Sequence, residues 1–207
     1  MTLPTLQESL SAVAAEAAAC TRCPLHSGRS CSVFSDGNPQ APLMLIGEGP
    51  GQQEDETGIP FVGKAGQLLT QILASVSIDR QRDIYICNTV KCRPPGNRAP
   101  EQDELAACQP YLQAQIDLIR PRIILLAGAT AMKAVLGIPS GITKLRGQWF
   151  ETPFHGAVAM PIFHPSYLLR NQSREKYSPK WWTWQDMKTI RTRLDALEAE
   201  RSEPVPV

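Results

Sequence analysis

Four short apolar runs constrain the fold of this chain more than any other feature of its sequence. They lie at Pro42–Gly47, Ile84–Cys87, Arg122–Gly128 and Val158–Phe163. The first three are continuous and rich in aliphatic residues, as in strands that are covered on both faces. Strands of this kind are typical of parallel sheets, so the sequence predicts a sheet that is buried between two layers.

Helical patterns separate these predicted strands. Apolar residues recur near helical spacing at Leu6–Cys20, Ala65–Val76, Pro100–Ile119, Ala129–Leu136 and Thr183–Ala199. The alternation predicts an α/β fold, namely an α/β/α sandwich with a four-stranded parallel sheet. A length of 207 residues fits a single domain. We place this domain at residues 1–200 and a short C-terminal tail at 201–207.

The composition is that of an ordinary globular protein. Hydrophobic residues make up 43% and charged residues 20%, which excludes disordered and fibrous proteins. No apolar run reaches the roughly 20 residues that span a bilayer, so no membrane association is expected. The first 19 residues carry two glutamates and no basic residue, unlike a targeting peptide. We therefore expect a cytoplasmic protein, in which six cysteines indicate metal or redox chemistry more than disulfides.

The spacing of the cysteines predicts a metal site. Cys20 and Cys23 form a Cys-x-x-Cys pair after the first predicted helix. Cys92 and Cys108, separated by 15 residues, could complete a set of four thiolates. Four thiolates suit zinc or an iron–sulfur cluster, and the spacing alone does not decide between them. Cys87 lies inside a predicted strand, where a thiol acts as a small hydrophobic group.

Two further motifs follow predicted strands, at the end of the sheet where ligands of such folds bind. The first is the turn Gly47–Gly51, which reads Gly-Glu-Gly-Pro-Gly. Its glycines would let backbone N–H groups approach a ligand closely, although a plain strand-to-helix turn uses glycine too. The second is His164, which leaves the last strand before a proline and is a candidate catalytic donor.

A basic and aromatic run lies near the C-terminus. Residues 170–193 contain seven Lys or Arg and only two acids, a local charge of +5 in a chain whose net charge is +1. Three tryptophans, Trp181, Trp182 and Trp184, lie inside this run. A charge run is often a solvated helix face. Aromatic residues between the basic ones also fit a nucleic-acid surface, so both interpretations stand.

Several long motifs, taken in order, resemble the family 4 uracil-DNA glycosylases. They are GEGPGQQED at 47–55, GIPFVGKAGQLL at 58–69, ICNTVKCRPPGNR at 86–98, the later Cys108, and HPSYLLRN at 164–171. The resemblance extends over nearly the whole chain. It implies excision of uracil from DNA and a [4Fe–4S] cluster. The cluster ligands of the family correspond here to Cys20, Cys23, Cys92 and Cys108, whereas Cys31 matches no family role.

The resemblance also implies how the base would be held. Such an enzyme flips its target base out of the duplex. The uracil would stack on Phe61, while the Asn88 amide would pair with its N3–H and O4. The backbone at Glu48 and Gly49 would face the O2 side, and His164 would donate a proton to O2 in catalysis. We expect Glu54 to exclude thymine at the C5 edge of the base. We expect the Glu48 carboxylate to orient the attacking water.

The remaining expectations concern DNA and assembly. Leu168, Leu169 and Arg170 would enter the duplex and fill the gap that the flipped base leaves. Phosphate contacts are expected from Lys91, Arg93, Arg98, Arg170 and Arg174. The substrate would be uracil-containing DNA, single- or double-stranded, bound by a monomer. The alternative is a non-catalytic, metal-stapled nucleic-acid-binding module of the same fold. A family 5 enzyme is disfavoured, because that family has an apolar residue where this chain has Glu48.

Overall fold

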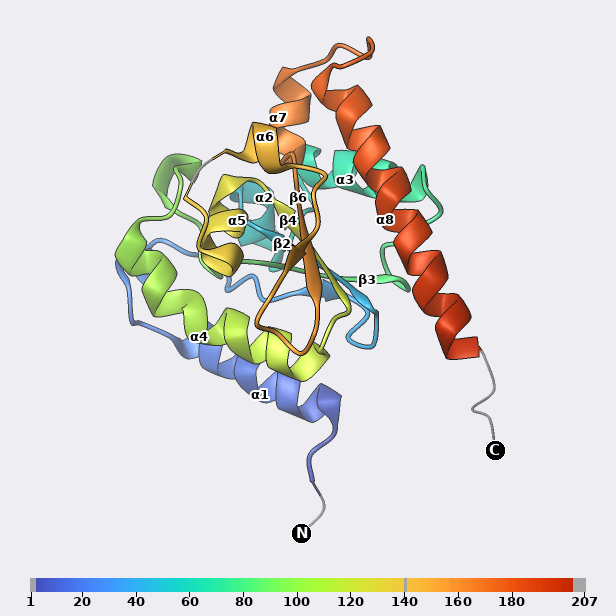
Figure 1. The fold of residues 1–207 in the computed structure, drawn as a ribbon. Coiled ribbons are helices and arrows are strands. Elements are labelled where there is room, and N and C mark those ends of the chain that lie inside the picture. The colour runs from blue at the N-terminus through green and yellow to red at the C-terminus, as the bar shows by residue number, and fades with distance from the viewer. Residues whose placement is uncertain (1–2, 140, 203–207) are drawn as a thin grey trace.

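The protein folds around one mixed sheet that lies between two layers of helices (Figure 1). The structure is a computed structural model, and it describes residues 3–139 and 141–202. The sheet order is β1-β3-β2-β4-β6-β5. The bounds of the strands are β1 Asp36–Gly37, β2 Leu43–Gly47, β3 Ile84–Asn88, β4 Ile123–Ala127, β5 Phe150–Glu151 and β6 Val158–Ile162. The predicted α/β class is confirmed.

The predicted number of strands, four, is wrong, because the sheet has six within the part of the chain that the structure describes. The four apolar runs form β3, β2, β4 and β6, which pair in parallel in that order. The two additional strands, β1 and β5, are two residues long and pair antiparallel at the two edges. Such short edge strands carry no run of buried residues, so hydrophobic patterning does not reveal them.

The long helices agree with the predicted segments to within a few residues. Their bounds are α1 Leu6–Ala19, α3 Lys64–Ala74, α4 Gln102–Ile119, α5 Ala129–Leu136 and α8 Pro179–Ser202. Short elements were not predicted: α2 Gln52–Thr57, α6 Ile142–Leu145, α7 Pro165–Arg170, and the 3₁₀ turns Pro24–Ser27 and Pro95–Asn97. The predicted tail began at residue 201, but α8 continues to Ser202, and residues 203–207 lie outside the described part.

Alternate residues of each central strand supply two separate cores. Leu43 and Leu45 of β2 pack with residues of α3 and α8 on one face of the sheet. Met44 and Ile46 pack with residues of α1, α4 and α5 on the other face. All five residues of β2 are buried, as are those of β3 and β4. This burial on both faces explains why their sequences are continuous apolar runs.

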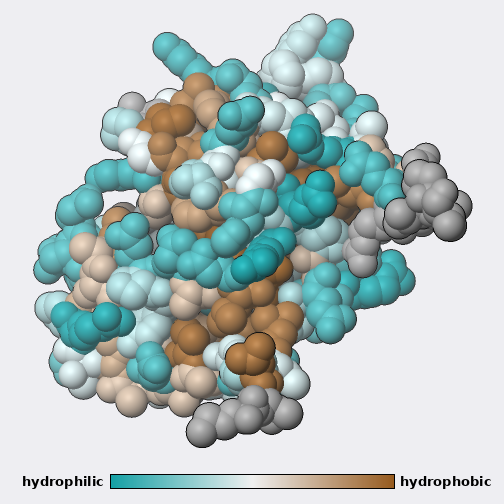
Figure 2. Space-filling model, turned by 60° about the horizontal axis from the view of Figure 1, so that its bottom comes forward, coloured by the Kyte–Doolittle hydropathy of each residue, from teal (hydrophilic) through white to brown (hydrophobic). Residues whose placement is uncertain are grey.

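The parallel strands all end on the same side of the sheet. In Figure 1, β6 runs upward into α7, so the carboxyl ends of the parallel strands point toward that side of the molecule. Figure 2 turns the lower end forward and shows a mostly hydrophilic surface with a central band of hydrophobic residues. Within the described residues, no helix is both long and apolar enough to cross a membrane.

Candidate active site

Three predicted site residues meet where β2, β3 and β6 end. Gly47 ends β2 and lies in register with Asn88, which ends β3. A Cβ atom at position 47 would overlap both the Asn88 amide oxygen and the Phe61 ring, so only glycine permits this contact. His164 follows β6, and its ring centroid lies 5.8 Å from that of Phe61. The structure thus gathers an aromatic face, an amide and an imidazole in one place.

Glu54 fixes the loop that carries Phe61. Phe61 itself is buried and has a left-handed backbone with φ of 54°. The Glu54 carboxylate accepts hydrogen bonds from the backbone N–H groups of Val62 and Gly63, at 2.9 and 2.8 Å, and of Gly51 at 3.1 Å. Its carboxylate is buried rather than exposed on a rim, and the loop N–H groups hold it in place. The predicted contact of Glu54 with the C5 edge of the base stays a prediction.

Arg80 supports the same loop from the other side, and sequence reasoning missed it. Its guanidinium donates to the carbonyl oxygens of Phe61 and Pro60, at 2.8 and 2.6 Å. Asp36 of β1 orients the guanidinium through a 2.9 Å ion pair. Gly66 completes the support, because a side chain there would overlap the Phe61 carbonyl. In the sequence, only the spacing of the glycines in FVGKAG indicates this close approach. Arg80 could not be identified, because it lies 19 residues after Phe61.

His164 is held in one tautomer. It caps α7, and its Nδ1 accepts a hydrogen bond from the backbone N–H of Ser166 at 3.2 Å. A nitrogen that accepts from an amide carries no proton, so the neutral ring carries its proton on Nε2. Burial lowers the pKa of His164 below 6.5, and the charge of Arg170 lowers it further, although Glu48 opposes both. The imidazole is therefore a neutral Nε2–H donor at neutral pH.

Asn88 has an unused acceptor. The residue is 1% exposed, and its Oδ1 is one of the buried side-chain atoms without a hydrogen-bond partner in the described structure. Lys91 supports Asn88 from behind, because its Nζ donates to the Asn88 carbonyl oxygen at 2.7 Å and to Gln115 Oε1 at 2.5 Å. The predicted phosphate contact of Lys91 is therefore wrong. Its side chain is 1% exposed and lies inside the protein.

Glu48 and Gly49 follow β2 beside these residues. Both are half-buried. The Thr130 hydroxyl, at the start of α5, donates to the Glu48 carboxylate and orients it. The Thr89 hydroxyl donates to the Glu48 carbonyl and fixes the backbone of the turn. A Cβ at Gly49 would lie 2.9 Å from the Val90 side chain, so the glycine permits a close approach of two segments.

The four predicted cysteine ligands line one small cavity. Cys20 and Cys23 follow α1, Cys92 follows β3, and Cys108 belongs to α4. Arg29 donates to Cys92 Sγ at 3.2 Å and to the Cys20 carbonyl at 3.0 Å. Burial raises the pKa of the Cys108 thiol to about 11, opposed by the charge of the buried lysine nearby. Among residues 3–139 and 141–202, no group of three or more His, Cys, Asp or Glu could hold a metal ion.

The predicted DNA contacts divide into three groups. Arg170 and Arg174 are exposed, and Leu169 is half-buried on α7. Arg98 is partly exposed but pairs bidentately with Glu104, at 2.8 and 2.6 Å, and Arg93 is half-buried and donates to Asn97. Leu168 is only 1% exposed, so its prediction as a wedge in DNA is wrong. Both leucines lie on a helix rather than a loop, and this helix turns one of them inward.

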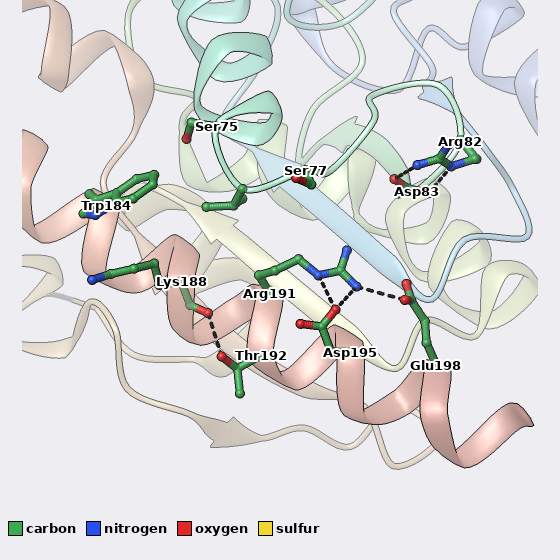
Figure 3. A pocket seen from close by; sticks show the side chains of 11 residues that line it. Ser75, Ser77, Arg82, Asp83, Trp184, Lys188, Arg191, Thr192, Asp195 and Glu198 are labelled. Atoms are coloured by element: carbon green, nitrogen blue, oxygen red, sulfur yellow. Dashed lines mark hydrogen bonds and ion pairs between the residues drawn. The ribbon is translucent and has the colours of Figure 1, made fainter. Parts of the chain in front are cut away.

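A wide groove of about 840 Å³ runs along α8, away from these residues (Figure 3). It lies between α8 and the segment that follows α3. Several of its charges pair with one another, as Figure 3 shows: Arg191 contacts Asp195 at 2.6 Å and Glu198 at 3.0 Å. Arg82 pairs with Asp83 at 2.7 Å. The groove contains none of the predicted site residues.

Comparison with known proteins gives a consistent result. The family model described as the uracil DNA glycosylase superfamily matches residues 34–188. A type-4 uracil-DNA glycosylase of Thermotoga maritima is 48% identical over 83% of this chain and 88% of its own length. One of Archaeoglobus fulgidus is 38% identical over 82% of this chain and 88% of its own. A type-5 uracil-DNA glycosylase of Pyrobaculum aerophilum is 29% identical over 67% of each chain.

Proposed function

The chain belongs to the uracil DNA glycosylase superfamily, and from this we propose that it hydrolyses the N-glycosidic bond of uracil in DNA, as a type-4 enzyme of base excision repair. The observation that carries the proposal is the meeting of Phe61, Asn88 and His164 at the ends of the central strands. These three groups offer a stacking face, a base-reading amide and a neutral donor. A flipped uracil needs each of them.

Asn88 would read the edge of the base. Its Oδ1 is buried without a partner, so it can accept the N3–H of uracil at no loss of another hydrogen bond. The amide nitrogen would then donate to O4. Cytosine has an unprotonated N3 and an amino group at C4, so both contacts would be mismatched. Leaving such buried groups unpaired costs about 1–3 kcal/mol each.

His164 would stabilise the leaving group. Cleavage of the glycosidic bond leaves positive charge on the sugar and negative charge on the departing uracil. A neutral imidazole with its proton on Nε2 can donate to O2 as that charge develops. A donor that is oriented in advance is typically worth about 3–4 kcal/mol in such a step. The backbone at Glu48 and Gly49 would bind on the same O2 side.

A water molecule would then attack the sugar carbon. Glu48 is the carboxylate that lies beside the ends of the strands, and the Thr130 hydroxyl orients it. We assign Glu48 to hold this water and to accept its proton. Glu54 would position Phe61, because it accepts hydrogen bonds from the N–H groups of the loop. We also assign to Glu54 the exclusion of thymine at the C5 edge of the base.

We propose that Cys20, Cys23, Cys92 and Cys108 hold a [4Fe–4S] cluster. The donor set supports this assignment, because four thiols from three chain segments line one cavity. Each thiolate of such a cluster binds a different iron, so the four sulfurs need not converge on one ion. When bound, the cluster would supply a structural cross-link between α1, α4 and the segment after β3. Arg29 would compensate part of its negative charge through Cys92.

DNA would bind across the same end of the sheet. Arg93, Arg98, Arg170 and Arg174 are partly or fully exposed there and would contact phosphates. Leu169 would fill the gap left by the flipped base. A cytoplasmic location and a monomeric state are proposed from the sequence alone.

The decisive experiment incubates uracil-containing oligonucleotides with the protein and then treats them with alkali, which breaks the strand where a base has been released. Strand breaks at uracil, with none in the same oligonucleotide containing thymine, support the proposal. A non-catalytic binding module would retain DNA without releasing uracil, and that result would contradict it. The absorbance spectrum of freshly purified protein tests the cofactor: a broad brown absorbance indicates an iron–sulfur cluster, whereas a colourless zinc-loaded protein excludes it.

A further inference from the structure

A group of aromatic rings at the junction of α7 and α8 has no part in the reaction proposed above. Tyr177 lies in the connection between the two helices, and Trp181 and Trp182 lie in the first turn of α8. The centroid of the Tyr177 ring is 5.3 Å from that of Trp181 and 5.9 Å from that of Trp182. The two tryptophan rings meet edge to face at 4.6 Å. We call these three residues the aromatic cluster.

Tyr177 is not explained by packing of the core. The residue is 62% exposed, and its backbone is left-handed with φ of 69°, a conformation that bulky residues rarely adopt. Strained backbone of this kind is often found at functional positions. Trp182 does have a structural explanation, because the Arg146 guanidinium lies 4.8 Å from the centre of its ring and pairs with the buried Asp186. Trp182 and Trp181 thus form a fixed base for the exposed tyrosine.

Exposed cations surround the aromatic cluster. Residues 170–180 contain four Lys or Arg and one Glu. Arg170, Arg174 and Lys176 are exposed, and the Lys176 ammonium lies 5.0 Å from the centre of the Tyr177 ring. Proteins that bind single-stranded nucleic acid combine these two features: cations contact the phosphates, and rings stack on unpaired bases. The chemistry of this surface therefore fits a single strand of DNA.

The position of the aromatic cluster fits the same partner. His164 caps the start of α7, and Arg170 is its last residue. Figure 1 shows the connection from α7 to α8 projecting beyond α7, at the end of the molecule toward which β6 runs. A strand that places a uracil against His164 can therefore continue along α7 and reach Tyr177.

We propose that the aromatic cluster binds an unpaired base of the strand that carries the uracil, with Tyr177 as the stacking ring. The inference rests on the proposed function, since it extends the path of the same strand. It assigns to the protein a second nucleotide site, outside the uracil site, that reads no particular base. Every base has a stacking face, so this site raises affinity without adding sequence preference.

The test measures binding to a labelled single-stranded oligonucleotide that lacks uracil, so that no product forms. Tyr177→Asn removes the ring and keeps a residue that tolerates left-handed backbone. We expect its dissociation constant to rise roughly 5- to 100-fold, the range that loss of one base–aromatic stack produces. Tyr177→Phe should bind like the wild type. Tyr177→Phe is therefore the matched control, because it keeps the ring at a position with the same left-handed backbone.

A second substrate makes the test specific for stacking. When abasic nucleotides replace the bases of this oligonucleotide, Tyr177→Asn and wild type should bind equally. Equal weakening by Tyr177→Asn on normal and abasic strands would contradict stacking. Normal DNA binding by Tyr177→Asn would exclude DNA as the partner of this surface. If the wild type releases no uracil, the proposed function fails. If it does release uracil but Tyr177→Asn binds normally, only this inference fails.

Discussion

At the scale of single residues, the proposal assigns the choice of base to Asn88. Asn88→Asp would present two acceptors at neutral pH. It could still accept from the N3–H of uracil, but it would repel O4, and it could accept from the amino group of cytosine. We expect Asn88→Asp to lose most uracil activity while losing less, or even gaining, on cytosine. The ratio of uracil to cytosine excision rates measures this change.

Asn97→Asp provides a charge-matched control for that experiment. Asn97 lies in an exposed 3₁₀ turn and uses its Oδ1 to accept from Arg93, an interaction that an aspartate keeps. Its substitution adds the same negative charge without facing the base, so the uracil-to-cytosine ratio should not change. If the ratio is also unchanged in Asn88→Asp, with both rates reduced alike, Asn88 merely supports the end of β3.

His164 links the site to the pH dependence of stability. Burial lowers its pKa in the native protein below 6.5, the value expected in the unfolded chain. As the pH falls below 6.5, the unfolded chain takes up a proton that the native state resists, so the free energy of unfolding decreases. His164→Gln removes this difference. Between pH 6.5 and about 5, the variant should therefore lose less stability than the wild type in urea titrations.

Although stability should fall below pH 6.5, the catalytic activity should persist there. A native imidazole with a lowered pKa stays neutral below pH 6.5, so uracil release at saturating substrate should persist into mildly acidic solution. Identical pH slopes of stability for wild type and His164→Gln would show that His164 titrates normally. The remaining two histidines, His26 and His155, are present in both proteins and cancel in the comparison.

Single residues also show where sequence reasoning ends. The resemblance identified Phe61, Asn88 and His164, and the structure brings them together. It did not reveal that Lys91 is buried, because the partner that satisfies its ammonium, Gln115, lies 24 residues away on α4. The hydrogen bonds of Glu54 were missed for the same reason, since its partners are N–H groups of a loop whose conformation no local pattern predicts.

At the scale of elements, α7 separates two leucines that the sequence presents as equivalent. Leu168 is buried, whereas Leu169 is half-buried and is the one proposed to enter DNA. Leu168→Ala should lower stability by about 2–5 kcal/mol, the usual cost of emptying a core leucine site. Leu169→Ala should change stability little, but it should reduce excision from duplex DNA more than from single strands, because a single strand leaves no gap to fill.

Each leucine serves as the control for the other. Thermal unfolding and the excision rates on both substrates measure these effects. Leu168→Ala should show the loss of stability, and Leu169→Ala should show the loss of duplex preference. Equal losses on duplex and single-stranded DNA by Leu169→Ala, with a lowered melting temperature, would assign both side chains to packing. Helix α7 is only six residues long and begins at a proline, so its pattern was too short to predict which leucine turns inward.

The central strands were predictable for a physical reason that the edges do not share. β2, β3 and β4 are buried on both faces, so the sequence of each strand contains a continuous apolar run. The edge strands β1 and β5 are held by two residue pairs each, and neither contains a buried residue. Their pairing follows from tertiary placement. β1 nevertheless matters, because its Asp36 orients the arginine that supports Phe61.

At the scale of the whole molecule, a chain of contacts joins the cysteine cavity to the uracil site. The backbone N–H of Lys91 donates to Cys108 Sγ at 3.3 Å, and its ammonium donates to the Asn88 carbonyl at 2.7 Å. Lys91 also holds Gln115, which in turn donates to the Tyr85 hydroxyl of β3 at 3.0 Å. The proposed cluster ligand Cys108 and the proposed base-reading residue Asn88 therefore share one buried support, although they lie in separate parts of the fold.

This arrangement predicts that losing the cluster disturbs base recognition as well as stability. Cys108→Ser should lose iron, because it removes one of the four thiolates. It should also lose stability, because metal binding at such a site contributes directly to the folding energy. Its melting temperature should fall, and its uracil excision should fall more than the residual folded fraction explains, since the segment that carries Lys91 loses its cross-link through the cluster to α4. Iron content, the visible absorbance spectrum and the excision rate per folded molecule measure the three effects.

Two cysteines outside the cavity provide the comparison. Cys87→Ser buries a hydroxyl in β3 at a cost of about 1–3 kcal/mol, and Cys31→Ser changes a half-buried thiol. Both should keep their iron and their brown colour, because neither side chain lines the cavity that the four ligands share. Equal iron loss in Cys87→Ser and Cys108→Ser would refute the choice of ligands. Iron loss in Cys108→Ser with an unchanged excision rate per folded molecule would keep the ligands but break the proposed connection through Lys91.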